Sequence, residues 1–361
     1  MWNIIQCTVR GRSHIKEDIP CQDKICSMNS GDFVVSALAD GAGSAKLSHF
    51  GAERVTQYMC TCMKEGFSEF YDEKDGTAFK HQIVSGIISE LKELAEEKGC
   101  DVKDLASTLM VVSVKEDKYI LLHIGDGVIG YLKKDGLKVA SAPDNGLFAN
   151  VTVFTTSENA VSKMKILKGS LGAIEGFVLM SDGSGASLYN KKERMLAPAV
   201  AKTMKLAKIS DISMLEKRVA ESLEKVIKTK TTDDCSIAIM MNDGNFHGYE
   251  MLDFVGKERL LGLPPICQMC RERRKNKRKK PIGSKAEIKR RRKERMRIVG
   301  VYDRILKIAG SWCDESFLRK RVKVKAKIFD SCLENLVSRY LMITENEKYK
   351  TAVVMRKNMV L

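Results

Sequence analysis

The sequence contains no long hydrophobic run, and no stretch approaches the ~18–20 continuous apolar residues of a membrane-spanning helix. Its first residues, MWNIIQCTVRGR, lack the charged segment followed by an apolar segment that is typical of a secretory signal. The 11 cysteines are odd in number and scattered, which favours free thiols over a disulfide framework. We therefore expect a cytoplasmic protein that has no membrane partner.

Regular repetition is also missing from the chain. We find no internal repeat with a period of about 20–50 residues, which argues against a solenoid or a propeller. Strand-like and helix-like segments do not alternate regularly, which argues against a doubly wound parallel sheet. An apolar fraction of 44% is ordinary for a globular protein, and 361 residues suffice for one large domain with an appendage.

Positive charge is concentrated in the last third of the chain. Residues 251–361 hold 31 Lys+Arg against 12 Asp+Glu, a net charge of +19. This leaves 31 of the 62 basic and 34 of the 46 acidic residues for residues 1–250, a net charge of −3. The shift predicts three parts: a near-neutral globular domain over 1–245, a basic linker over 246–297 and a small, mostly helical extension over 298–361.

The basic C-terminal region allows two interpretations. Its Lys/Arg runs could bind nucleic acid or acidic partners, or they could form a solubilising linker. Aromatic residues are sparse among them, which argues against base stacking. The Cys267-x-x-Cys270 pair suggests zinc, but a structural zinc site normally needs two tight pairs, so we interpret this pair as coincidental.

Apolar spacing in the first 245 residues predicts an α+β fold. Two helices follow an early strand, a run of short strands comes next, and further helices precede a closing strand. The turn-like links KEDK and KKDG predict that consecutive strands of the run are antiparallel neighbours. The predicted strands are 33–39, 107–115, 118–124, 127–133, 137–140, VTVFTT (151–156), 176–181 and the one within TTDDCSIAIMM, and the predicted helices are 44–63, 81–99, 197–206 and 212–228.

Carboxylates recur where predicted strands end. Three aspartates each follow an apolar run and precede a glycine, a pair precedes the closing strand, and one more precedes the first strand: Asp40, Asp126, Asp182, Asp233–Asp234 and Asp23. A single Asp-Gly is most often only a turn. Gathered together, however, such carboxylates would repel one another unless divalent cations neutralised them, and oxygen ligands without histidine favour Mg²⁺ or Mn²⁺ over Zn²⁺.

The order of these motifs resembles that of a known family. CQDKI, LADGAGS, LASTLM, IGDGVIG, LMSDGSG and TTDDCSIAI follow one another as in the metal-dependent protein phosphatases of the protein phosphatase 2C type, and the Pro-Cys-Gln-Asp variant resembles a bacterial branch. The resemblance spans roughly residues 8–242. It implies an antiparallel β-sandwich flanked by helices, a four-layer αββα arrangement.

The resemblance also implies a metal centre with two Mn²⁺ or Mg²⁺ ions, and a weaker third site. Asp40 would bridge the two ions, and the Gly41 carbonyl would bind one of them. Asp182 and Asp233 would complete the other ion's ligands, Asp23 would hold metal-bound water, and Asp126 with Asp182 would form the third site. Asp233 is preferred to Asp234 because the family's ligand precedes a Ser/Thr by three residues, here Ser236.

In two places the sequence departs from the family pattern. Many members carry a phosphate-binding arginine about five residues before the first acidic motif, where this chain has Asp18. Arg12, His14 and Lys16 lie nearby, and we choose Arg12 as the catalytic residue that binds phosphate, because a guanidinium can bind phosphate in a bidentate manner. The alternative for Arg12 is a solvated surface charge. Some relatives place a histidine where Ala42 stands, so the proton for the leaving group must come from a metal-bound water or from elsewhere. His14 and His123 are the candidate substitutes, and a structural or surface histidine is the alternative for each.

Two functions remain in view from the sequence. The first is a serine/threonine phosphoprotein phosphatase in which a hydroxide bridging two Mn²⁺ or Mg²⁺ ions attacks phosphorus. Its partners would be phosphoserine and phosphothreonine proteins and a cognate Ser/Thr kinase. The second is a catalytically weak phosphatase fold that works as a binding module, with its basic tail on nucleic acid or acidic partners.

Overall fold

The computed structural model divides into two compact units. The first comprises Met1–Lys208 and Leu215–Gly244, and the second comprises Ile209–Met214 and Asn245–Leu361. The structure describes residues 2–143, 152–243, 254, 257–258, 261–263, 285–339, 341–345 and 348–352. The Cys267/Cys270 pair and most of the predicted linker lie outside the described residues.

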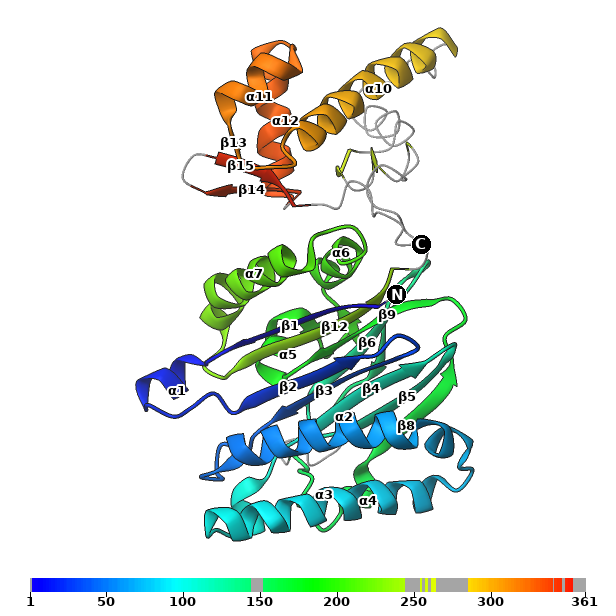
Figure 1. Ribbon diagram of the computed structural model, residues 1–361, viewed down its shortest axis with the longest axis vertical. Helices are drawn as coiled ribbons and strands as arrows, with labels where there is room; N and C mark the ends of the chain where they lie inside the picture. Colours follow the sequence, from blue (N-terminus) through cyan, green and yellow to red (C-terminus); the bar gives the residue numbers. More distant parts are fainter. Residues whose placement is uncertain are drawn as a thin grey trace. The chain divides into compact units, whose positions relative to one another are not determined.

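Two five-stranded antiparallel sheets face each other in the first unit (Figure 1). One sheet has the order β1 (Trp2–Val9), β12 (Cys235–Asn242), β9 (Ile174–Met180), β6 (Val128–Lys133) and β7 (Gly136–Ser141). The other has the order β2 (Asp23–Asn29), β3 (Phe33–Asp40), β4 (Leu109–Lys115), β5 (Lys118–Ile124) and β8 (Lys165–Ser170).

The sequence of strand β3 is almost continuously apolar because the strand packs on both of its faces. Val34 and Leu38 pack between the two sheets, together with Phe177 and Met240 of the facing sheet. Val35 and Ala37 point the other way, into the core beneath the helices. Because both faces of β3 are buried, every residue from Phe33 to Ala39 is apolar except Ser36.

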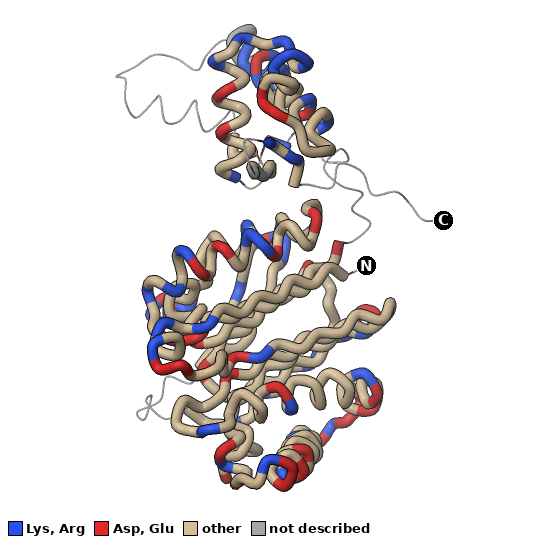
Figure 2. The backbone as a smooth tube through the Cα atoms, turned by 60° about the vertical axis from the view of Figure 1, so that its left-hand side comes forward, with Lys and Arg blue, Asp and Glu red and all other residues tan. Residues whose placement is uncertain are grey.

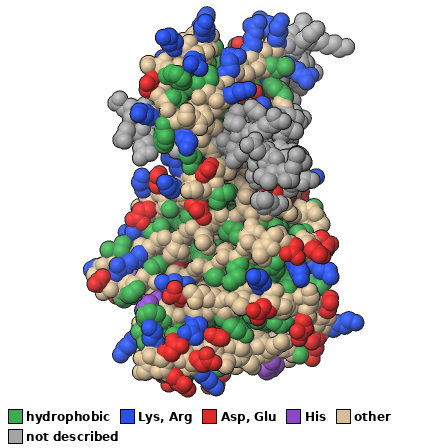
Figure 3. All heavy atoms as spheres, in the orientation of Figure 1, with side chains coloured by type: hydrophobic (Ala, Val, Ile, Leu, Met, Phe, Trp, Pro, Cys, Tyr) green, Lys and Arg blue, Asp and Glu red, His purple; other side chains and the backbone are tan. Residues whose placement is uncertain are grey.

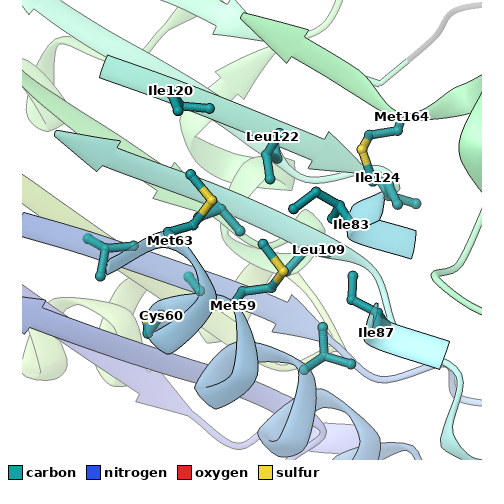
Figure 4. Packing of buried hydrophobic residues seen from close by; sticks show 14 of the residues in the cluster. Met59, Cys60, Met63, Ile83, Ile87, Leu109, Ile120, Leu122, Ile124 and Met164 are labelled. Carbon is teal, nitrogen blue, oxygen red and sulfur yellow. The ribbon is translucent and has the colours of Figure 1, made fainter. Parts of the chain in front are cut away.

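Helices cover the outer faces of both sheets. The long helices α2 (Ser48–Asp72) and α3 (Gly76–Lys98) lie over the β2–β8 sheet, and the core between them contains Met59, Cys60, Met63, Ile83 and Ile87 (Figure 4). On the other sheet lie α5 (Asp182–Leu188), α6 (Pro198–Leu206) and α7 (Ile212–Ser222), which continues as turns η2 (Leu223–Ile227) and η3 (Lys228–Lys230). The predicted αββα sandwich is confirmed.

Short elements complete this unit. They are α1 (Arg12–Lys16), η1 (Val102–Leu105), α4 (Ala160–Lys163), β10 (Tyr189–Asn190) and β11 (Met195–Leu196). Figure 2 shows that charged residues of both signs are more frequent on the helices than along the sandwich strands.

Two sequence expectations within the sandwich are wrong. KEDK joins β4 to β5 and KKDG joins β6 to β7, and both pairs are antiparallel neighbours. The consecutive strands β5 and β6, however, lie in different sheets. The chain crosses between the sheets at Gly125–Gly127 and places Asp126 at the crossing. The VTVFTT segment forms no strand over its described residues 152–156. Its polar groups bond to neighbouring loops instead: the Thr155 N–H donates to Ser107 O at 2.8 Å.

The second unit contains three helices and a small sheet. Its elements are α10 (Lys285–Ile308), β13 (Cys313–Asp314), α11 (Glu315–Val322), α12 (Ala326–Ser338), β14 (Met342–Glu345) and β15 (Lys348–Thr351), and the sheet order is β13-β15-β14. Helix α10 begins inside the segment that we predicted as linker, and the predicted helical extension also contains strands. Among the described residues, no helix is long and apolar enough to span a bilayer.

Candidate metal centre

A cavity of about 260 Å³ lies at one end of the sandwich. Strand ends and the loops that follow them form its wall: Ser13, His14, Gln22, Asp40, Gly41, Ala42, Gly43, Thr108, Asp126, Thr152, Phe154, Asp182, Thr232 and Asp233. A larger hollow of about 1270 Å³ lies along the edge strands β7 and β8, but it contains none of the predicted site residues. The smaller cavity is therefore the candidate site.

Three carboxylates converge in this cavity. Asp40, Asp126 and Asp182 each offer an oxygen atom, and these oxygens all lie within 4.8 Å of one another. Asp40 ends β3, Asp126 occupies the crossing between the sheets, and Asp182 begins α5 directly after β9. The three Asp-Gly turns of the sequence thus meet at one end of the sandwich.

Asp40 is fixed by the strands on both sides of it. Its backbone N–H donates to Thr108 Oγ1 at 2.9 Å, and its carbonyl accepts from the Thr108 N–H at 2.8 Å. The Gly41 N–H donates to Gln22 O at 3.2 Å. On β2, Asp23 is the residue paired with Asp40. These bonds hold Asp40 at the cavity wall without using its carboxylate oxygens.

The carboxylates of Asp126 and Asp182 differ in the hydrogen bonds that they accept from the protein. Thr152 Oγ1 donates to Asp126 Oδ2 at 2.6 Å, a contact that sequence reasoning missed because Thr152 belongs to the supposed strand. Asp182 Oδ1 is buried and accepts no hydrogen bond from the described residues. Next to it, a Cβ on Gly183 would lie 2.1 Å from Asp234 O, so only glycine allows this turn to approach the β12 segment.

The adjacent aspartates before β12 face different surroundings. Asp233 lines the cavity, whereas Asp234 does not and is 1% exposed. The Asp234 carboxylate accepts the N–H groups of Gly11 and Gln22, both at 2.6 Å, and lies 2.9 Å from His14 Nδ1. Asp234 thus ties the chain on both sides of α1 to β12, and Asp233 is the member of the pair that faces the cavity.

Asp23 lies behind the cavity wall and is 1% exposed. Burial, together with the nearby charges of Asp234 and Asp182, raises the pKa of its carboxyl to about 8, although the neighbouring hydroxyls of Ser236 and Ser181 lower it. Neither of its oxygens has a hydrogen bond of good geometry to the described residues.

Burial and neighbouring negative charges also raise the pKa values of Asp40 and Asp182. Burial, then the charges of Asp23, Asp182 and Asp233, raise the pKa of Asp40 well above its usual range. Burial, then Asp126 and Asp233, raise the pKa of Asp182 to about 6. Buried carboxylate oxygens without donors, gathered within reach of one another, fit a hard divalent cation that is bound by oxygen ligands.

The basic residues predicted for the site lie in different places. His14 is buried on α1 and lines the cavity. Arg12 is exposed and does not line the cavity, and its Nε donates to Thr231 O at 2.9 Å, next to the lining residue Thr232. His123 is buried on β5, where its Nδ1 lies 2.7 Å from Ser141 Oγ, and it is not part of the cavity wall.

Comparison with known proteins shows the family of this chain. The family model described as Protein phosphatase 2C matches residues 10–227. The chain belongs to the protein phosphatase 2C family. The curated "Serine/threonine-protein phosphatase 3" of Escherichia coli (strain K12) is 30% identical over 191 residues, which cover 50% of this chain and 73% of that protein.

Solved structures similar to this phosphatase 2C family member cover about two thirds of the chain. The serine/threonine phosphatase Stp1 from Staphylococcus aureus is 15% identical, with a TM-score of 0.47 over 68% of this chain and 96% of its own. The catalytic domain of the phosphatase PstP, solved in complex with two manganese ions, is 13% identical, with a TM-score of 0.41 over 67% of this chain and 99% of its own.

The family match ends before Asp233, so the choice between Asp233 and Asp234 depends on the cavity itself. Several lining residues were not predicted as part of the site, among them Gln22, Thr152 and Phe154. Gln22 precedes a predicted ligand in the sequence, and its Nε2 donates to Ser48 Oγ at 2.8 Å. No periodicity or spacing in the sequence indicates these three positions.

Proposed function

We propose that this protein is a metal-dependent phosphatase that removes phosphate from phosphoserine and phosphothreonine residues of other proteins. The observation that carries the proposal is the convergence of Asp40, Asp126 and Asp182 within 4.8 Å at the wall of a cavity, in a member of the protein phosphatase 2C family. Three carboxylates held this close, with burial raising two of their pKa values, are costly to keep unless cations neutralise them.

The cavity residues fit a centre of two Mn²⁺ or Mg²⁺ ions and a weaker third. Asp40, the Gly41 carbonyl, Asp182 and Asp233 would hold the two ions, and Asp126 with Asp182 the third. When bound, such ions activate water as a nucleophile and neutralise charge on the phosphoryl oxygens. Asp23, behind the wall, has unpaired oxygens that would accept hydrogen bonds from water in this centre.

Two basic residues would complete the reaction. Arg12 is anchored by its Nε beside Thr232 at the cavity, and we propose that its remaining guanidinium nitrogens bind the phosphate. His14 is the histidine on the cavity wall, with its Nδ1 held against Asp234, and we propose that it gives a proton to the departing seryl or threonyl oxygen.

Substrates with different leaving groups can distinguish the proposed roles of His14 and Arg12. An alkoxide needs a proton when it leaves, whereas p-nitrophenolate leaves without one, so His14→Ala should lower kcat on a phosphoserine peptide far more than on p-nitrophenyl phosphate. Arg12→Ala should raise KM for both substrates, because it removes a contact to the phosphoryl group itself. Equal losses of kcat on both substrates in His14→Ala would argue against the proton-donor role.

The function itself is tested with phosphopeptides. Purified protein should release phosphate from phosphoserine and phosphothreonine peptides when Mn²⁺ or Mg²⁺ is added, and EDTA should abolish the release. A phosphotyrosine peptide of the same sequence serves as the specificity control and should be hydrolysed more slowly. Turnover that persists in EDTA would refute the metal mechanism, and preference for phosphotyrosine would refute the substrate class.

A catalytically weak binding module is the second candidate. Ala42 in place of a histidine and Asp18 in place of an arginine favour it, because both positions contribute to catalysis in relatives. Against it, every acidic position of the motifs is filled, and Asp40, Asp126 and Asp182 are brought together. Tight binding of Mn²⁺ with no turnover on any phosphopeptide would favour the module.

Partners and location follow as further proposals. Phosphoprotein substrates imply an opposing Ser/Thr kinase in the same compartment, and we propose the cytoplasm. The cysteines support this location, because the nine that the structure describes are all free thiols. Nucleic-acid binding through the basic C-terminal residues is a prediction from charge, and the fold of the second unit bears on it.

A further inference from the structure

The second unit orders its elements in a recognisable way. After α10 come a short strand, two helices and a two-stranded hairpin, and β13 pairs with the last strand of the hairpin (Figure 1). Helices α11 and α12 are joined by only three residues, Lys323–Lys325, and Lys323 adopts a left-handed conformation with φ 37°. A short turn between two helices, followed by a hairpin, is the arrangement of a winged helix-turn-helix.

The packing of this unit determines which side of α12 faces solvent. Phe329, Cys332, Leu333 and Leu336 are buried on one side of the helix, and α12 contacts both α10 and α11. The opposite side is an exposed stripe at helical spacing: Lys327, Ile328, Ser331, Glu334 and Ser338. Ile328 is 41% exposed although it is apolar, and nothing in the described part of this unit covers it.

Positive charge is densest where α11 turns into α12. Six basic residues stand within the nine positions 319–327. Arg319 pairs with Glu315 and Asp330, and Arg321 stacks on Phe317, so these two are engaged within the unit. Lys320, Lys323, Lys325 and Lys327 are exposed. Figure 3 shows Lys and Arg side chains gathered on this unit, whereas the sandwich shows both signs.

The exposed stripe changes character along α12. Its N-terminal half carries Lys327, Ile328 and Ser331, directly after Lys323 and Lys325, and its C-terminal half carries Glu334. A recognition helix contacts base edges with its N-terminal residues. Lysine and serine hydrogen-bond to base edges, and an apolar side chain contacts the thymine methyl group.

We propose that the second unit binds double-stranded DNA, with the N-terminal half of α12 in the major groove. Lys323, Lys325 and Lys327 lie where the backbone phosphates flank that groove, and Ile328 and Ser331 face the bases. Lys348 at the start of β15 is also exposed, and the hairpin that carries it reaches the neighbouring backbone. The exposed Arg290, Arg292, Lys293 and Arg297 of α10 add charge that attracts any polyanion.

Duplex DNA fits this surface better than the other polyanions do. The major groove of B-form DNA is about 12 Å wide and admits a helix, whereas that of duplex RNA is deep and narrow. Single strands are held chiefly by stacking on aromatic side chains, and the exposed stripe of α12 has none. An acidic protein would match the lysines but leaves the exposed Ile328 and the helix-turn-helix arrangement without a purpose.

The test uses full-length protein and fluorescence anisotropy. The probes are a duplex DNA of about 30 base pairs and mixed sequence, and a duplex RNA of the same sequence, titrated between about 50 and 200 mM salt. The first variant is Lys323→Gln, Lys325→Gln, Lys327→Gln. Its charge-matched control is Lys64→Gln, Lys92→Gln, Lys134→Gln, three exposed lysines of the first unit.

Wild type should bind the DNA duplex at least tenfold more tightly than the RNA duplex. The first variant should lose at least tenfold in affinity for DNA, and the slope of log affinity against log salt should become shallower by roughly 2–3, about 0.9 for each phosphate contact removed. The control should bind like wild type. Equal losses in the two variants, or RNA binding as tight as DNA binding, would overturn the proposal.

A second variant tests the groove without changing charge. Ile328→Ala with Ser331→Ala should keep the salt slope of wild type but select different sequences from a random duplex pool. Identical selection, or no selection by either protein, would show that the lysines only adhere to the backbone, and would overturn the placement of α12 in the groove. The melting temperature of each variant confirms that it is folded.

Discussion

Asp233 and Asp234 are neighbours with different roles: we propose that Asp233 binds metal, whereas Asp234 accepts buried backbone hydrogen bonds. Substitution of each residue should separate the two roles. Asp234→Ala leaves the buried N–H groups of Gly11 and Gln22 without their acceptor, which should cost about 2–5 kcal/mol of unfolding free energy. Asp233→Asn removes a charge that repels Asp40 in the cavity, so it should leave the metal-free protein at least as stable as wild type.

Thermal unfolding in EDTA measures both effects. For a unit of this size, about 1 kcal/mol shifts the melting temperature by roughly 2–4 °C, so Asp234→Ala should melt many degrees below wild type. Mn²⁺ should raise the melting temperature of wild type and fail to do so fully in Asp233→Asn. The assignment of roles would be reversed if Asp233→Asn were the unstable variant and Asp234→Ala bound metal normally.

The raised carboxyl pKa values predict how the stability of the metal-free protein depends on pH. Burial raises the pKa of Asp182 to about 6 and of Asp23 to about 8, against about 3.8 for the free side chain. The folded state therefore holds protons that the unfolded state has released, so the contribution of these two groups to stability is full below pH ~4 and is lost as pH rises through these values.

Melting temperatures between pH 5 and 9 in EDTA should accordingly decline as pH rises. Mn²⁺ neutralises the ionised carboxylates, so the increase that it gives should be larger at pH 8 than at pH 6. A metal-free protein that becomes more stable between pH 6 and 8 would show that the cluster is not the dominant titrating group.

At the scale of elements, helix α2 depends on one close approach. A Cβ on Gly51 would lie 1.9 Å from Leu105 O, so Gly51→Ala must push α2 away from η1. Overpacking of this kind costs about 1–3 kcal/mol. Gly76→Ala is the matched control, because nothing lies within 4 Å of the added Cβ at the start of α3.

Gly51→Ala should lower both the melting temperature and the affinity for Mn²⁺, because the loop from Asp40 to Ser48 joins the cavity to α2. Gly76→Ala should match or slightly exceed wild type. Equal melting temperatures for the two variants would show that α2 can shift at no cost.

The sequence predicts the elements whose signals are local. The continuous apolar run of β3, the stripe of α3 and the Asp-Gly turns all depend on residues that are close in the chain, and the structure contains each of them. The crossing between β5 and β6 has no such signal, because it depends on which sheet each strand joins. The same holds for β1, which pairs with β12 from the far end of the unit.

The residues of the site also divide into those with a local sequence signal and those that only the tertiary fold brings together. Asp40, Asp126, Asp182 and Asp233 were predicted and line one cavity. Thr152 was assigned to a strand, and only the tertiary fold brings its hydroxyl to Asp126. The role of Asp234 as an acceptor for Gly11 and Gln22, more than 200 residues earlier, has no signature in the sequence.

At the scale of the whole molecule, we propose that the two units have separate tasks. All residues that line the cavity lie before residue 244, and the proposed DNA surface lies after residue 314. A chain ending at Asp243 should therefore keep its metal-dependent turnover of p-nitrophenyl phosphate and lose its affinity for duplex DNA.

Circular dichroism and the two assays on this shortened chain decide the matter. Ile209–Met214 belongs to the second unit, so its loss of partners should lower stability without abolishing folding. A shortened chain that fails to fold, or one that folds and still binds duplex DNA like the full chain, would contradict the division.

The central claim is that the carboxylates of the cavity form a metal centre, and a calorimetric titration with Mn²⁺ tests it most directly. Wild type should bind at least two ions, and Asp40→Asn should lose this binding while its circular dichroism spectrum is unchanged. Asp135→Asn removes an exposed carboxylate on the β6–β7 turn, outside the cavity, and should bind Mn²⁺ like wild type. No binding by wild type, or equal binding by wild type and Asp40→Asn, would contradict the account.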